Sequence, residues 1–297
     1  MNLNGVLLLN KPKGMTSHDC VMKLRRILGT KKIGHTGTLD PDVDGVLPIC
    51  IGSATKLVQF LTAETKEYIG EVTIGYSTTT EDASGEVLLE QPVETAISQE
   101  EIEAILASML GTQIQIPPMY SAVKVGGKRL YEYARAGQEV ERPQREVTIH
   151  ELELLGDVHH KDGLVKFKFR VHGSKGIFIR TVAVTIGEKL GYPAHMSDLT
   201  RMASGNFKLD DCATFDDVEA GNFKLLTISE ALSDFSTVTV DNWVEKLVRN
   251  GVKLREDQIQ PPMKEGLFLI RSVENSPLSI HEWREERQGY VSIRGLW

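Results

Sequence analysis

Short segments of this chain either alternate apolar and polar residues or are continuously apolar, and both patterns are typical of β-strands. Five segments are predicted as strands: 5–10, 45–51, 66–76, 145–155 and 164–172. Four segments with helical spacing are predicted as helices: 17–28, 54–61, 98–110 and 177–190. Thr16 and Ser17 can cap the first of them, Ser98 and Glu101 form a capping box at the start of the third, and Gly191 follows the last as a stop. Strands interleaved with modest helices predict an α+β domain, with a mostly antiparallel mixed sheet and flanking helices.

The pattern changes at about residue 237 to a small helix at 244–249 and three short strand-like segments. These segments are 266–273, 279–285 and 289–297. We therefore predict two domains, 1–236 and a compact β-rich unit at 237–297. A basic and aromatic stretch, 117–145, interrupts the first domain and is broken by Gly126 and Gly127.

The composition is that of an ordinary globular protein, because 41% of the 297 residues are hydrophobic and 25% are charged. No apolar run approaches the length that crosses a membrane, and residues 1–10 lack the features of a signal peptide. The three cysteines are scattered without metal-binding spacing, which favours a reducing compartment. We expect a cytoplasmic protein that has no membrane partner and binds no metal.

The charged residues are segregated along the chain, although the net charge of −7 does not itself suggest a nucleic-acid partner. Lys and Arg dominate residues 1–40 and 161–208, whereas 81–103 contains acidic residues and no basic one. This distribution is compatible with one basic RNA-facing surface and an acidic back. It is equally compatible with an ordinary mixed surface.

Residues 34–52 place a single carboxylate, Asp40, on a stiff loop before an apolar strand. Gly34 and Gly37 permit backbone shapes that other residues avoid, and Pro41 fixes its own φ and pushes Asp40 toward an extended conformation. Catalytic carboxylates are usually presented in this way. A lone Leu-Asp-Pro triplet would instead indicate an ordinary turn.

The whole of residues 34–52 resembles the signature of the tRNA pseudouridine synthase B family. Further motifs that resemble the family's follow in its order: Leu9–His18, Lys66–Tyr68, Pro117–Lys124, Ser174–Arg180 and Ala194–Arg201. The resemblance implies isomerisation of uridine-55 in the T-loop of tRNA to pseudouridine, by base flipping and without a cofactor. It also implies the pseudouridine synthase fold, a PUA-like RNA-binding module at 237–297, an insertion that clasps RNA, and a monomer that binds the T-arm.

The same resemblance assigns roles to single residues. It implies that Asp40 is catalytic, either attacking C1′ or removing the C2′ proton, and that Arg180 pairs with it. It implies substrate contacts for four residues: His35, Tyr68, Phe178 and Leu199. Phe178 departs from the family, which ordinarily has tyrosine there. The expected RNA-binding residues are Lys11, Lys13, Lys124, Lys128, Arg129 and Lys175.

Two other functions remain open at this stage. Asp40, Asp42 and Asp44 could supply the paired carboxylates of a carbohydrate-active enzyme. The chain could also bind or fold tRNA without catalysis. Product mass distinguishes the first alternative from isomerisation, because hydrolysis changes the mass and isomerisation does not. An Asp40→Asn variant distinguishes the second, because a catalytic protein should lose turnover while it still binds RNA.

Overall fold

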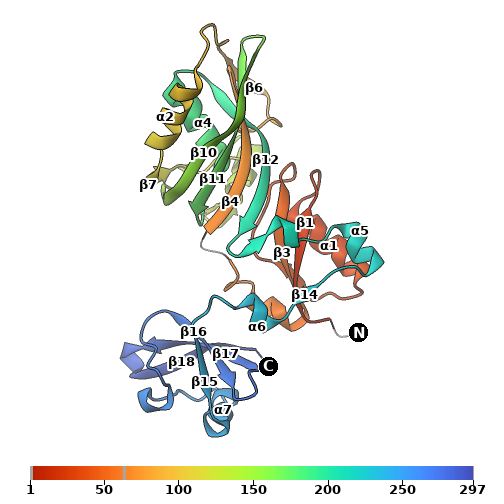
Figure 1. Ribbon diagram of the computed structural model, residues 1–297, viewed down its shortest axis with the longest axis vertical. Helices are drawn as coiled ribbons and strands as arrows, with labels where there is room; N and C mark the ends of the chain where they lie inside the picture. The colour runs from red at the N-terminus through yellow and green to blue at the C-terminus, as the bar shows by residue number, and fades with distance from the viewer. Residues whose placement is uncertain (1–2, 63–64, 297) are drawn as a thin grey trace.

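The computed structural model describes residues 3–62 and 65–296, and the molecule is elongated, with its C-terminal residues at one end (Figure 1). Within these residues ten strands form one mixed sheet. Its main path runs β14 (Leu225–Leu226), β1 (Gly5–Lys11), β3 (Asp44–Ile51), β12 (Ala194–Ser204), β4 (Thr65–Ile74), β11 (Leu164–Ser174), β10 (Arg145–Lys161) and β7 (Gly111–Gln115). Two short strands extend it, β2 (Ile33–His35) on β3 and β13 (Phe207–Lys208) on β12. The predicted α+β class is confirmed, and all five predicted strands are present.

One neighbouring pair of the sheet, β3 and β12, is parallel, whereas the other neighbouring pairs are antiparallel. Only two residue pairs join β3 to β12, Thr200 with Asp44 and Arg201 with Gly45. The sheet therefore consists of two halves that meet over a short seam. The loop that carries Asp40 enters β3 at this seam.

Helices cover the sheet as the sequence pattern predicts. In the part of the chain that the structure describes, the α-helices of the main domain outside the insertion are α1 (Ser17–Ile27), α2 (Gln99–Ser108), α4 (Ile179–Leu190), α5 (Phe215–Ala220) and α6 (Ile228–Ala231). Thr16 and Ser98 are N-caps, and Gly191 ends α4 at φ 82°. Helices α2 and α4 lie on the half of the sheet that contains β10 and β11 (Figure 1). The predicted helix at 54–61 is instead a 3-10 helix, η1 (Gly52–Leu57), followed by turns.

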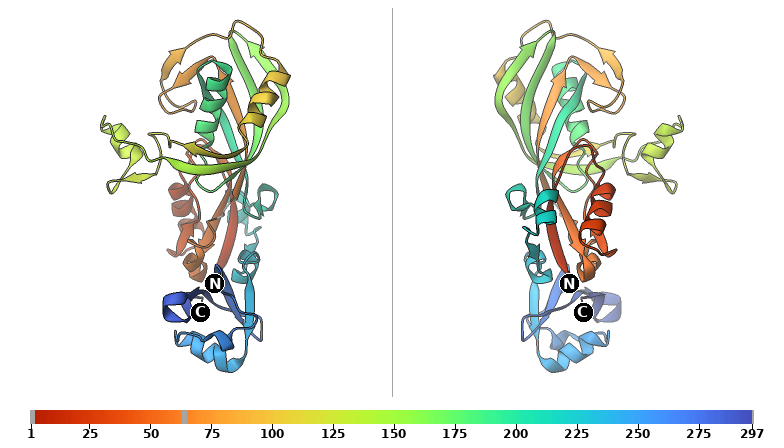
Figure 2. Two further views of the ribbon diagram at one scale, coloured as in Figure 1. Left: turned by 90° about the vertical axis from the view of Figure 1, so that its left-hand side faces the viewer. Right: turned by 90° about the vertical axis from the view of Figure 1, so that its right-hand side faces the viewer.

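Residues 117–145 project sideways from the body of the molecule (Figure 2). They form a small hairpin, β8 (Lys124–Val125) and β9 (Lys128–Arg129), followed by helix α3 (Leu130–Arg135). We call these residues the insertion. A second hairpin, β5 (Tyr76–Thr78) and β6 (Val87–Glu90), extends from β4.

The C-terminal residues form a separate four-stranded sheet with its own hydrophobic core. Its strands are β15 (Thr237–Val240), β16 (Leu267–Ser272), β17 (Pro277–Arg284) and β18 (Gly289–Gly295), and helix α7 (Asn242–Arg249) packs against it. The same residues form the short 3-10 helices η3 (Glu256–Gln258) and η4 (Glu285–Arg287), whereas η2 (Leu209–Asp211) lies in the main domain. Leu269 and Ile280 of this sheet share a second buried cluster with Val6 and Leu8 of β1. The C-terminal sheet is therefore attached to the main domain by buried apolar contacts.

Among the helices of residues 3–62 and 65–296, none combines the length and the apolar character needed to cross a membrane.

Candidate active site

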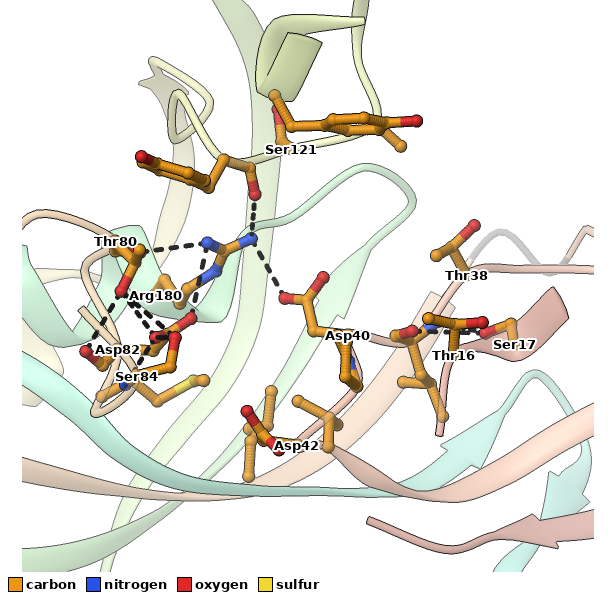
Figure 3. A pocket seen from close by; sticks show the side chains of 18 of the residues that line it. Thr16, Ser17, Thr38, Asp40, Asp42, Thr80, Asp82, Ser84, Ser121 and Arg180 are labelled. Carbon is orange, nitrogen blue, oxygen red and sulfur yellow. Dashed lines mark hydrogen bonds and ion pairs between the residues drawn. The ribbon is translucent and has the colours of Figure 1, made fainter. Parts of the chain in front are cut away.

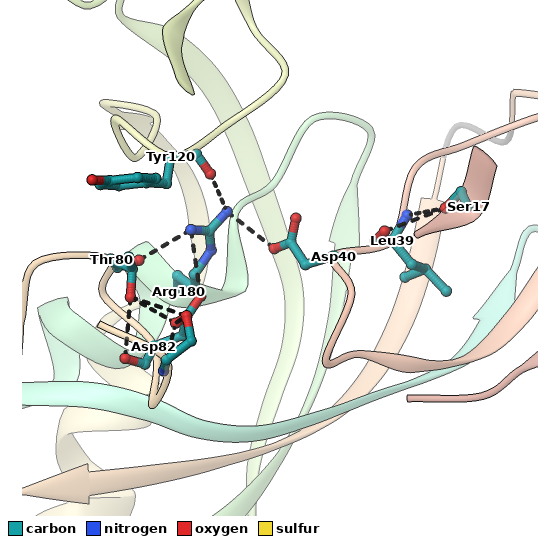
Figure 4. Close-up of polar contacts among 8 residues, drawn as sticks. Ser17, Leu39, Asp40, Thr80, Asp82, Tyr120 and Arg180 are labelled. Carbon is teal, nitrogen blue, oxygen red and sulfur yellow. Dashed lines mark hydrogen bonds and ion pairs between the residues drawn. The ribbon is translucent and has the colours of Figure 1, made fainter. Parts of the chain in front are cut away.

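Two side chains from other elements hold the loop that carries Asp40. The Ser17 hydroxyl, at the start of α1, accepts a hydrogen bond from the Leu39 N–H at 2.9 Å. The Lys11 ammonium donates to the carbonyls of Pro12 and Pro41 at 2.8 and 3.0 Å. The backbone on both sides of Asp40 is thus fixed, so its carboxylate is aimed by the fold rather than by a flexible loop (Figure 4).

The Arg180 guanidinium makes four polar contacts around Asp40 (Figure 4). Nη2 lies 3.0 Å from Asp40 Oδ2 and donates to the Tyr120 carbonyl at 2.9 Å. Nη1 donates to the Thr80 carbonyl at 3.0 Å and lies 3.6 Å from Asp82 Oδ2. Only 6% of the Arg180 side chain is exposed, which makes it a rigid, desolvated partner for the carboxylate. The structure therefore brings together the two residues that the resemblance pairs.

Asp82 and its turn were not predicted from the sequence. Asp82 Oδ1 accepts hydrogen bonds from the Ser84 N–H, the Ser84 hydroxyl and the Thr80 hydroxyl. This leaves Oδ2 to face Arg180 (Figure 3). In the sequence Asp82 belongs to the acidic run at 81–103, and nothing in that run distinguishes it from its acidic neighbours.

Asp40 is surrounded by protein yet reachable. Its side chain exposes 43% of its surface, into a cleft instead of open solvent. Burial raises the pKa of Asp40 above its ordinary value, and the Arg180 charge opposes this rise. A carboxylate that is poorly hydrated, held at one oxygen and open at the other is suited to act as a base or a nucleophile.

Two cavities meet at Asp40 and Arg180. The larger, about 840 Å³, is also lined by His35 and by Arg129, Tyr131 and other residues of the insertion (Figure 3). The smaller, about 400 Å³, is lined by Tyr68, Phe178 and Leu199 among others. Leu199 lines both cavities. All the predicted substrate-contacting residues thus line one of the two cavities.

Tyr68 lies on β4 opposite Arg201 of β12, and only 7% of its surface is exposed. Burial raises the pKa of Tyr68, and the charge and hydrogen bond of Arg201 oppose this shift. Arg201 is itself buried; its Nε donates to the Val46 carbonyl at 2.7 Å, while its Nη2 lacks a partner among the described residues. Tyr68 and Arg201 are therefore cross-strand neighbours, and both line the smaller cavity.

Phe178 is the N-cap residue of α4, and its backbone is held on both sides by one side chain. Gln115 accepts from the Phe178 N–H at 2.9 Å and donates to its carbonyl at 3.4 Å. The position of the ring is therefore set through the main chain and not by a hydroxyl, which phenylalanine lacks.

The His35 ring is partly buried, and burial lowers its pKa, so the ring is neutral at pH 7. Its Nδ1 has no partner in the described part of the chain. A neutral ring at the wall of the larger cavity is suited to contacting a nucleotide, as expected.

The expectation that Lys11 binds RNA does not fit the structure. Its side chain is fully buried, and its ammonium is occupied by the two carbonyls of the Asp40 loop. Lys13 is exposed at the surface and forms an ion pair with Asp198. Lys11 is therefore a structural support of the catalytic loop, and only Lys13 of the two can reach RNA.

The other predicted RNA-binding residues are exposed: Lys124, Lys128, Arg129 and Lys175. Lys124 and Lys175 line the smaller cavity together with Lys66 and Arg145. This concentration of positive charge beside Asp40 is suited to the phosphates of a nucleic acid.

Within the insertion, cations and tyrosine rings interleave. The Arg129 and Arg135 guanidiniums lie 5.7 and 5.4 Å from the Tyr131 ring centre, and the Lys128 ammonium lies 5.7 Å from that of Tyr133. Such surfaces combine neutralisation of the phosphate backbone with stacking on unpaired bases.

The two other acids of the alternative carboxylate pair are placed differently. Asp44 Oδ1 accepts a hydrogen bond from the Thr200 hydroxyl at 2.6 Å, whereas Asp42 lines the larger cavity together with Asp40. In the described ranges, no group of three or more His, Cys, Asp or Glu side chains is placed to hold a metal ion.

Comparisons with known proteins agree with this geometry. Residues 25–179 match the model of the TruB family pseudouridylate synthase N-terminal domain, and 180–234 match the tRNA pseudouridylate synthase B C-terminal domain. The chain is 55% identical to tRNA pseudouridine synthase B of Bacillus cytotoxicus, over 97% of this chain and 95% of that one. It is 58% identical to the protein of the same name from Geobacillus kaustophilus, over 85% of this chain and 91% of that one.

Solved structures share the fold. A chain in the crystal structure of a Cbf5-Nop10-Gar1 complex aligns with a TM-score of 0.75 at 24% identity. A chain in the structure of an H/ACA RNP bound to a substrate RNA containing 2′-deoxyuridine aligns with a TM-score of 0.72 at 22% identity. Both alignments cover 99% of this chain and 85% of the other.

Proposed function

The chain belongs to the TruB family of pseudouridylate synthases, and on this premise we propose that its target is uridine-55 in the T-loop of tRNA. It is a tRNA pseudouridine synthase, an enzyme that isomerises uridine in tRNA to pseudouridine. The observation that carries the proposal is the Asp40–Arg180 pair at the junction of two cavities, one of them bordered by a basic and aromatic insertion.

The reaction rearranges one nucleotide without changing its mass. The N1–C1′ bond breaks, the base rotates while bound, C5 bonds to C1′, and the proton displaced from C5 is replaced by one at N1. Arg180 holds Oδ2 of Asp40, so Oδ1 is the oxygen that can act at the ribose. Asp40 either attacks C1′ or removes the C2′ proton, and its geometry is compatible with both.

The residues of the smaller cavity support a role in holding the flipped base. We propose that the Tyr68 ring stacks on the base, while Leu199 and Phe178 pack beside it. Base stacking on an aromatic ring contributes about 1–3 kcal/mol, which offsets much of the few kcal/mol that extrusion costs. His35 contacts the displaced nucleotide from the larger cavity.

Binding to the T-arm is proposed to involve the insertion and the cations around the smaller cavity. Lys124, Lys128, Arg129 and Lys175 are exposed and near the site, and Lys13 adds a cation at the surface. The C-terminal unit at 237–297 is proposed to be a PUA-like RNA-binding module. A monomer acting in the cytoplasm, where tRNA is modified, remains our expectation.

The proposal is tested with a T-arm stem-loop that carries C5-tritiated uridine, incubated with the full chain. We expect release of tritium, an unchanged RNA mass, and pseudouridine mapped to position 55 by carbodiimide labelling and primer extension. A matched stem-loop with cytidine at position 55 and labelled uridine elsewhere serves as the control. Equal release from the control would refute the choice of position.

A further inference from the structure

Both ends of the insertion contact the network around Arg180. At its first end, the Tyr120 carbonyl accepts a hydrogen bond from Nη2, the same nitrogen that lies 3.0 Å from Asp40. Any shift of this end changes the hydrogen bonding of the nitrogen that orients the catalytic carboxylate.

The second end is attached through Arg142. Its Nη1 donates to the Pro117 carbonyl at 3.1 Å, which ties the end of the insertion to its beginning. The same nitrogen lies 3.9 Å from Oε1 of Glu81, a residue of the main domain. Arg142 thus joins the base of the insertion to the turn that carries Glu81.

Glu81 occupies the centre of the turn that holds Arg180. Its neighbours Thr80 and Asp82 supply the two groups that contact Nη1 of Arg180. The backbone of Glu81 is in the left-handed region at φ 63°, where a residue other than glycine is strained. The Glu81 carbonyl accepts a hydrogen bond from the Met196 N–H at 3.0 Å. Oε2 is buried without a partner in the described chain. Burial raises the pKa of Glu81, the charges of Arg180 and Arg142 oppose this rise, and Arg142 forms the ion pair with Oε1.

The turn and the insertion border a common hollow of about 670 Å³. It is lined by Thr79, Met119, Tyr120, Ala134 and residues 137–141. In Figure 2 the insertion projects from the body, attached at its base. A movement of the insertion would reach the site around Arg180 through these points of attachment, where Tyr120 and Arg142 lie.

We propose that Arg142 and Glu81 are positioning residues that couple the placement of the insertion to the orientation of Arg180 and Asp40. RNA that is held by the insertion fixes the two ends by which the insertion is attached to the body. The Arg142–Glu81 contact then fixes the turn, and the turn fixes the guanidinium that orients Asp40. This inference rests on the proposed isomerisation of uridine in the T-arm and adds a device by which engagement of RNA reaches the catalytic carboxylate.

The test uses full-length Arg142→Gln, Glu81→Gln and the double variant, with single-turnover tritium release at saturating stem-loop and a separate binding titration. We expect each single variant to lower the rate about tenfold, because small misplacements of reacting groups carry large rate costs. Affinity should change less than about threefold, because RNA binding is spread over many cations. The double variant should be no slower than the worse single variant, since both remove one coupling.

Lys224→Gln is the matched control, because it breaks an exposed ion pair with Glu230 at 3.2 Å, outside the proposed site. Its rate and affinity should equal those of the unmodified chain. If Glu81→Gln fails to fold, as judged by circular dichroism, Arg142→Gln carries the test alone, since 35% of that side chain is already exposed.

Unchanged rates, additive losses in the double variant, or losses confined to affinity would overturn the coupling. An unmodified chain that releases no tritium would instead refute the proposed reaction, so the two failures are distinguishable.

Discussion

Replacing Arg180 by lysine keeps the positive charge but removes the planar pair of terminal nitrogens. In the structure Nη2 contacts the Asp40 carboxylate and the Tyr120 carbonyl, while Nη1 contacts the Thr80 carbonyl and the Asp82 carboxylate. The single ammonium of lysine cannot occupy both positions, so at least one pair of contacts is lost. Arg180→Lys should therefore keep Asp40 ionised but leave it poorly aimed.

The size of the effect follows from the contact that is lost. A hydrogen bond to a charged group contributes about 1.5–3 kcal/mol. If that amount is lost in the transition state, the single-turnover rate falls about 10- to 150-fold. RNA affinity should stay within about threefold, because the Arg180 side chain is 6% exposed and phosphate binding rests on surface cations.

The assay is single-turnover tritium release at saturating stem-loop, at a temperature where circular dichroism shows the variant folded. The matched control is Arg170→Lys, in which a half-buried arginine loses its contacts to Glu67, Glu151 and Glu153 on the sheet. The control should keep the normal rate. A normal rate in Arg180→Lys would refute the view that two-sided contacts of this guanidinium aim Asp40.

The pH dependence of the single-turnover rate is a second test of the contact between Asp40 and Arg180. Asp40 must be ionised to act, so the rate should fall as the pH drops through its pKa, which burial raises above the ordinary value. The Arg180 cation lowers that pKa, so Arg180→Gln should move the acid limb of the profile to higher pH. A limb that stays in place or moves to lower pH would contradict this electrostatic role.

Three further predictions follow from the site and the domain contact. Phe178→Tyr should change the single-turnover rate by less than about tenfold, or under 1.4 kcal/mol in barrier, because Gln115 already fixes the backbone; a hundredfold acceleration would show that the hydroxyl matters. Tyr68→Phe removes the hydroxyl but keeps the ring, so it should keep most of the activity. Tyr68→Ala should lose about 1–3 kcal/mol of base stacking, measured as single-turnover rate, and equal losses in the two variants would refute stacking. Removing residues 237–297 should weaken tRNA binding. It should also lower the melting temperature, because the apolar cluster shared with β1 becomes exposed, and an unchanged melting temperature would contradict the shared core.

The Asp40 loop was accessible from the sequence because its determinants are local. Pro41 and the following apolar run lie within a few residues of Asp40, and the strand that they predict is present as β3. The glycine part of the prediction was wrong, because neither Gly34 nor Gly37 has the positive φ that favours glycine. The Arg180 partnership was accessible only through resemblance to a family, since nothing in the sequence brings residues 140 positions apart together.

The remaining parts of the site depend on long-range contacts that no local pattern encodes. Thr80 and Asp82 reach Arg180 because the turn between β5 and β6 pairs with β12, where Asp82 forms an isolated bridge with Met196. Lys11 was expected to bind RNA, but it is buried, and two carbonyls of the Asp40 loop compensate its charge. Strand β15 was missed because four residues, Thr237–Val240, are too few to show a period.

The most direct test of the account is Asp40→Asn in the tritium-release assay, with binding of the same T-arm stem-loop measured in parallel. Asparagine keeps the shape and can still accept a hydrogen bond from Arg180, but it is neither a base nor a nucleophile. The account predicts no detectable release of tritium and an RNA affinity within a few-fold of the unmodified chain. Turnover near that of the unmodified chain would contradict it.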